Sequence, residues 1–152
     1  MSPFVRQLLL FLHLIAAMAW VGGMFFAYFC LRPAAADTLD PPKRLPLWAA
    51  TFKRFLPYTA VAVAVILVSG LALLVQNDWR QAPLGWNIMT MLGAVMTLVF
   101  GYVYLVLFPR LRAHCDLAAW PAAAQALNAI RRLVAINLTL GVCAVAASIY
   151  AR

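Results

Sequence analysis

Acidic residues are scarce in this 152-residue chain. It contains no glutamate, and its four aspartates (Asp37, Asp40, Asp78 and Asp116) all fall between long apolar runs. A carboxylate inside the bilayer is the usual device of proton- and sodium-coupled transporters. The sequence therefore argues against a transporter built on buried acids.

Cysteine and histidine are also few. The three cysteines, Cys30, Cys115 and Cys143, show no C-x-x-C spacing, so the sequence predicts no disulfide framework. Of the two histidines, His13 interrupts an apolar run, whereas His114 falls in a polar connecting segment.

Apolar residues dominate what remains. They make up 66% of the chain, and the mean hydropathy is +0.92. A soluble globule this small has too little interior to bury so much apolar side chain. Four runs of near-membrane length predict an all-α fold, a four-helix transmembrane bundle. We expect one membrane domain over residues 1–152, with helices at about 4–32, 46–76, 86–109 and 121–151, and a proline-rich loop at RPAAADTLDPPKR.

The net charge of +8 is distributed unevenly between the two ends of these runs. Nine of the basic residues fall in the segments after the first and third runs, and only Arg6, Arg80 and Arg152 fall elsewhere. The positive-inside rule then places both termini on the outer, periplasmic side of a bacterial inner membrane. Because the charges lie between apolar runs and form no soluble basic face, we expect a lipid bilayer and no nucleic acid as partner.

His13 is the leading candidate for a functional residue, because an ionisable group at membrane depth is costly. It lies about 8 Å into the apolar layer at the helical rise. Ser69, Met91 and Cys143 fall at comparable depths, with Met96 slightly deeper. Imidazole, thioether and thiolate suit Cu(I), so His13, Met91, Met96 and Cys143 are the predicted metal ligands.

Two alternatives for His13 stay open. The imidazole can simply hydrogen-bond Ser69 or a backbone carbonyl and fix the bundle. It can also serve as an axial ligand of haem b in a membrane redox protein, although His114 lies too far away, in the inner loop, for a bis-histidine site within one chain.

Small and aromatic residues predict helix packing at Trp20, Gly23 and Ser69. The stripe that contains Gly23 allows close backbone approach, either within the bundle or between copies in a homo-oligomer. Gly93, Thr97 and Gly101, spaced by four residues, offer a matching ridge.

Basic residues near the inner boundary are candidates for binding an anion such as a lipid phosphate or a haem propionate. These are Lys53, Arg54, Arg131 and Arg132. The alternative is that they only set topology and contact headgroups.

Three stretches, LHLIAAMAWVGGMFFAYFCLRPAA, TFKRFLPYTAVAVAVILVSG and WPAAAQALNAIRRLVAINLTLG, resemble the small stand-alone members of the CopD copper-resistance membrane family. The resemblance implies copper handling or transport in the bacterial inner membrane, with copper import as the usual proposal and periplasmic copper proteins as possible partners.

A more distant similarity to HemJ-type protoporphyrinogen oxidases implies haem ligation by His13. That family carries a lysine soon after a tryptophan of the third helix, but no lysine follows Trp86, which argues against oxidase chemistry. No catalytic residue is predicted, and a non-catalytic membrane subunit is the remaining alternative.

Overall fold

The computed structural model describes residues 2–76 and 83–150, except for the side chain of Tyr150, and these residues are almost entirely helical. The prediction of an all-α, four-helix bundle is confirmed. The elements in chain order are α1 (Pro3–Phe25), the π-helix η1 (Phe26–Leu31), α2 (Arg32–Thr38), α3 (Pro41–Gln76), α4 (Leu84–Tyr102), the π-helix η2 (Val103–Leu107), α5 (Phe108–Asp116) and α6 (Trp120–Tyr150). They form four rods, because α1, η1 and α2 are continuous, as are α4, η2 and α5.

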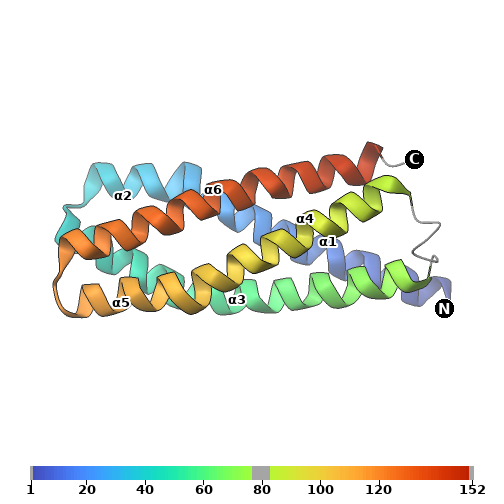
Figure 1. The fold of residues 1–152 in the computed structure, drawn as a ribbon, viewed down its shortest axis with the longest axis horizontal. Coiled ribbons are helices and arrows are strands. Elements are labelled where there is room, and N and C mark those ends of the chain that lie inside the picture. Colours follow the sequence, from blue (N-terminus) through green and yellow to red (C-terminus); the bar gives the residue numbers. More distant parts are fainter. Residues whose placement is uncertain (1, 77–82, 151–152) are drawn as a thin grey trace.

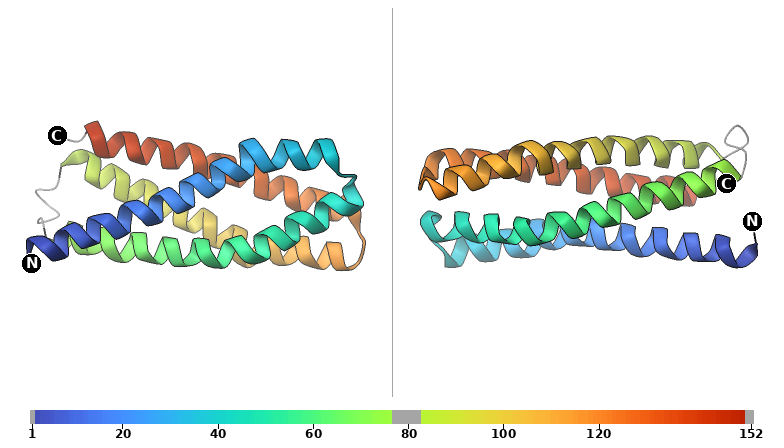
Figure 2. Two further views of the ribbon diagram at one scale, coloured as in Figure 1. Left: turned by 180° about the vertical axis from the view of Figure 1, so that it is seen from behind. Right: turned by 90° about the horizontal axis from the view of Figure 1, so that it is seen from below.

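The rods lie lengthwise beside one another (Figures 1 and 2). The start of α1, the end of α3, the start of α4 and the end of α6 lie at one end of the bundle, and the two segments rich in arginine and lysine lie at the other, here named the basic end (Figure 1). Within the bundle, α1 packs mainly on α3, and α4 mainly on α6. The membrane side that each end faces stays a prediction, and Asp78, Arg80 and Arg152 lie outside the described residues.

The outer surface of the bundle is apolar. In the most apolar 18-residue window of each rod, between 11% and 28% of the residues are buried. Large side chains such as Val68, Leu98 and Leu105 are 68% to 75% exposed. Soluble proteins rarely expose continuous apolar surface on this scale, whereas lipid solvates it. The surface is that of a multi-pass membrane protein.

The best-packed core lies towards the basic end. Leu111, Ala123 and Ile130 are fully buried there, and Trp48 is 2% exposed. At a rise of 1.5 Å per residue, the rods are about 45 to 54 Å long, against a hydrocarbon thickness of about 30 Å. The helices are therefore long enough to continue beyond the apolar layer.

The helices are longer than the sequence pattern suggested. The expected loop RPAAADTLDPPKR is helical except at Leu39 and Asp40, and the third rod continues past Pro109 to Asp116. A proline ring clashes with the carbonyl four residues earlier in a regular α-helix, but it is tolerated in a first turn, where its missing N–H needs no partner. Pro33 and Pro109 lie inside continuous rods, however, at the starts of α2 and α5, and each directly follows a π-helical stretch whose wider turn makes room for the ring.

Candidate functional site

His13 contacts the neighbouring helix through a side-chain hydrogen bond. Its Nδ1 lies 2.9 Å from the Oγ of Ser69, which joins α1 to α3. Ser69 is 1% exposed, whereas His13 is only partly buried. One of the alternatives left open for His13, a hydrogen bond to Ser69, is therefore present.

The second hydrogen bond of Ser69 determines the direction of the first. The Ser69 hydroxyl donates to the Val65 carbonyl at 2.5 Å, and the Ile66 carbonyl lies farther away at 3.3 Å. Because the single hydroxyl proton is directed at its own helix, the Ser69 oxygen accepts from Nδ1–H of His13. In this tautomer the lone pair of the imidazole is on Nε2, the arrangement that metal-binding histidines use when a neighbouring acceptor fixes Nδ1.

Gly70 lets α3 approach the imidazole. A Cβ atom built at Gly70 would lie 3.2 Å from Cε1 and 3.6 Å from Nδ1 of His13. A side chain at this position would press on the ring. The consecutive Ser69 and Gly70 thus supply both an acceptor and a flat surface for His13.

The other predicted metal ligands differ in their exposure. Met91 is 61% exposed and Cys143 is exposed as well, so both side chains lie on the outer surface of their helices. Met96 is 4% exposed and packs inside a cluster with Trp20 and Met24. Within residues 2–76 and 83–150, no group of three or more histidine, cysteine and acidic side chains is placed to hold a metal.

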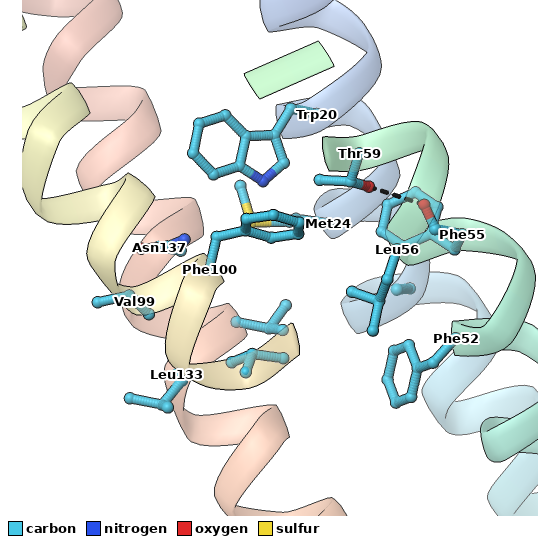
Figure 3. Close-up of a pocket in the computed structure, with 13 residues that line it drawn as sticks. Trp20, Met24, Phe52, Phe55, Leu56, Thr59, Val99, Phe100, Leu133 and Asn137 are labelled. Atoms are coloured by element: carbon cyan, nitrogen blue, oxygen red, sulfur yellow. Dashed lines mark hydrogen bonds between the residues drawn. The ribbon is translucent and has the colours of Figure 1, made fainter. Parts of the chain in front are cut away.

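An interior cavity of about 30 Å³ lies between His13 and the basic end, farther along α1. All four rods contribute side chains to it (Figure 3). Trp20 and Met24 enter it from α1, and Phe100 from α4, with the Trp20 and Phe100 rings edge to face at 6.0 Å. Asn137 enters it from α6 and is 3% exposed. Its Nδ2 donates to the Met96 carbonyl at 3.1 Å, while its Oδ1 has no partner among the described residues. Asn137 was not among the residues predicted from the sequence.

The predicted packing residue Gly23 meets a different neighbour from the one expected. A Cβ atom at Gly23 would lie 2.5 Å from two ring carbons of Phe55 in α3. A Cβ atom at Gly93 or Gly101 would meet nothing within 4 Å, so these two glycines of the expected ridge make no close helix contact among the described residues. Gly23 instead creates room for an aromatic ring.

The four predicted anion-binding residues also differ in their exposure. Lys53, Arg54 and Arg132 are exposed, while Arg131 is partly buried against the ring of Trp48. The Cζ of Arg131 lies 5.5 Å from the centroid of that ring.

Comparison with known proteins assigns the family. The sequence model described as "Copper resistance protein D" (CopD) matches residues 49–150, which is more than half of the chain. The chain belongs to the CopD family. This CopD match covers Ser69, Met96, Asn137 and Arg131, but it begins after His13 and Trp20.

One curated relative from Aquifex aeolicus (strain VF5), named only as an uncharacterized protein, is 34% identical to this CopD-family chain over 100 residues. The match covers 64% of this chain and 65% of the relative, so the aligned part spans just under two thirds of the relative's length. No solved structure matches the chain.

Proposed function

We propose that this CopD-family protein binds and moves copper ions in the inner membrane of a bacterium, with His13 as a copper ligand. The observation that carries the proposal is the hydrogen bond between His13 Nδ1 and Ser69 Oγ. It holds an imidazole in an otherwise apolar helix with Nε2 left as the donor atom.

A ligand role explains both the residue and its setting. Neutral imidazole is a good ligand for copper, and an acceptor on the opposite ring nitrogen fixes the ring and raises its basicity. His13 is only partly buried, so part of its side chain remains exposed.

Two methionine thioethers, farther along the bundle than His13, offer further ligands for a soft metal ion. Met24 and Met96 belong to one buried cluster below His13, and thioether sulfur suits Cu(I). Met91 and Cys143 point outward, so on this proposal they act only with donors from outside the chain, such as a second copy or a periplasmic copper protein.

Haem b is less well supported than copper. The cavity around Asn137 and the smaller one near Arg131 are about 30 and 20 Å³, each the size of one or two water molecules. His13 itself contacts Ser69 and Gly70 and lines neither of these cavities. The residues around these cavities therefore do not fit an interior macrocycle.

Anaerobic titration of the purified protein with Cu(I), in competition with a chromophoric chelator, tests the proposal. We expect about one tightly bound Cu(I) per chain and no Soret band in the absorption spectrum. A protein that never competes for Cu(I), or that purifies with a Soret band, would refute it. A protein that binds neither ligand would favour the non-catalytic subunit.

A further inference from the structure

Two buried N–H groups at the basic end have no acceptor. Trp48 of α3 is 2% exposed, and its indole Nε1 has no hydrogen-bond partner in the structure. Arg131 of α6 lies over the same indole ring, and its Nε is also buried and unpaired. Buried donors without partners are rare in folded proteins, because each costs the free energy of its lost hydration.

Positive charge accumulates around these donors. Arg32 and Arg44 both act electrostatically on Arg131 and repel its guanidinium. Arg32 is held over the ring of Tyr28, with Cζ 5.0 Å from the centroid. The hydrogen bond from Arg131 to Asn128 is long, at 3.4 Å. No aspartate forms an ion pair with these arginines in the part of the chain that the structure describes.

A small cavity of about 20 Å³ adjoins the same side chains. Tyr28, Arg32, Trp48 and Arg131 line it together with apolar residues, and it is partly open to the outside. A cavity of this size holds one or two oxygen-sized atoms. The Nε1 of Trp48 and the Nε of Arg131 are themselves buried, so an oxygen that enters the cavity reaches them only when these side chains shift.

We propose that Trp48, Arg131 and Arg32 form a binding site for a phosphate group at the basic end of the bundle. One phosphate oxygen accepts from Trp48 Nε1–H and Arg131 Nε–H, and Arg32 balances the charge. Guanidinium groups bind phosphate with short, charge-assisted hydrogen bonds. The phosphate comes either from an anionic lipid headgroup or from the solution.

This site differs from the predicted set of basic residues. Lys53, Arg54 and Arg132 are exposed and do not line the cavity. Arg132 carries the same charge as Arg131, one position along α6, but does not reach Trp48. It is therefore the matched control for Arg131.

The test uses the full chain, delipidated in a neutral detergent, with two probes: phosphatidylglycerol and inorganic phosphate. Affinity is measured by native mass spectrometry for the lipid and by ligand-dependent thermal shift for both. We expect Arg131→Gln to weaken binding about tenfold or more, as loss of a charge-assisted contact does, while Arg132→Gln changes it less than about twofold. Trp48→Phe, which keeps an aromatic ring and removes the unpaired N–H, should weaken binding without lowering the melting temperature of the ligand-free protein.

The outcomes distinguish a lipid phosphate from a free phosphate, and both from the absence of a specific site. Selective binding of phosphatidylglycerol assigns the site to a lipid headgroup, and binding of inorganic phosphate with the same variant dependence assigns it to a free phosphate. Equal losses in Arg131→Gln and Arg132→Gln would show a diffuse charge effect and overturn the proposal. Absence of binding by the wild type to both probes, or unchanged affinity in Trp48→Phe and Arg131→Gln, would also overturn it.

Discussion

His13 in α1 and Ser69 in α3, 56 residues apart in the sequence, are joined by a hydrogen bond of 2.9 Å between Nδ1 and Oγ. The Ser69 proton is directed at the Val65 carbonyl, so Ser69 is the acceptor. This pair links the α1–α3 contact to the proposed chemistry, because one bond both holds two helices together and fixes the imidazole.

Replacement of Ser69 by alanine tests this link. The Nδ1–H of His13 loses its acceptor, so we expect the free energy of unfolding to fall by about 1–2 kcal/mol. Loss of the group that orients the ligand should also weaken Cu(I) binding by about 10- to 100-fold. Unfolding in detergent and Cu(I) competition measure the two effects. Ser148→Ala is the control, because the Ser148 hydroxyl bonds only to Val145 in its own helix. Equal behaviour of the two variants would contradict the assigned role of Ser69.

Gly22 and Gly23 offer a matched pair for testing helix packing. A Cβ at Gly23 overlaps the Phe55 ring, whereas a Cβ at Gly22 meets nothing within 4 Å. We expect Gly23→Ala to reduce the free energy of unfolding by about 1–3 kcal/mol, as overpacking does, and Gly22→Ala not to reduce it. The helix-propensity gain is common to both variants and cancels in the comparison.

The double variant of Gly23→Ala with Phe55→Leu identifies the cause of that loss. A smaller side chain at position 55 removes the overlap, so the double variant should lose less stability than the sum of the two single variants. Additive losses would place the effect of Gly23 somewhere other than the Phe55 contact.

Asn137 makes one hydrogen bond, to the Met96 carbonyl, and leaves its Oδ1 unpaired beside an apolar cavity. In Asn137→Leu the lost bond is offset by removal of the unpaired oxygen, so the free energy of unfolding should change by less than about 1 kcal/mol. Asn137→Asp introduces a carboxylate at the same place and should destabilise the protein by about 2.5–3.5 kcal/mol at neutral pH. Equal stability of the Asp and Leu variants would mean that water reaches this position.

Four helices were predictable because runs of near-membrane length with few charges have few other solutions. The helix ends were less predictable, since Pro33, Pro41 and Pro109 each favour a loop or a helix end when only the sequence is considered. In the structure Pro41 begins α3, where proline is tolerated, whereas Pro33 and Pro109 follow π-helical stretches inside continuous rods. A proline in the sequence does not reveal whether a helix ends at that residue.

The candidate site was only partly predictable for a related reason. Equal depth brought His13 and Ser69 together as a possible pair, but depth says nothing of the angular position of a side chain. Met91 and Cys143, which were predicted for that layer, have exposed side chains. Asn137 was missed because its acceptor is a backbone carbonyl 41 residues earlier, which no side-chain pattern marks.

The orientation of the bundle is open to a direct test. Nine basic residues lie in the segments at one end and three lie elsewhere, so we expect the basic end to face the cytoplasm. In a variant without Cys30, Cys115 and Cys143, a cysteine introduced by Asp116→Cys should resist a membrane-impermeant thiol reagent in intact cells, whereas Ser2→Cys should react. The reverse labelling pattern would invert the side from which copper reaches His13.

Copper binding by His13→Gln, measured beside the wild type, tests the central claim most directly. Glutamine keeps hydrogen-bonding capacity and similar bulk but lacks the imidazole nitrogen that a soft metal ion requires. The variant should insert and unfold within about 1 kcal/mol of the wild type, as expected for one hydrogen bond, and lose its bound Cu(I). His114→Gln, altered at the end of α5, should keep it. Full Cu(I) binding by a folded His13→Gln variant would contradict the account and leave His13 as a packing residue.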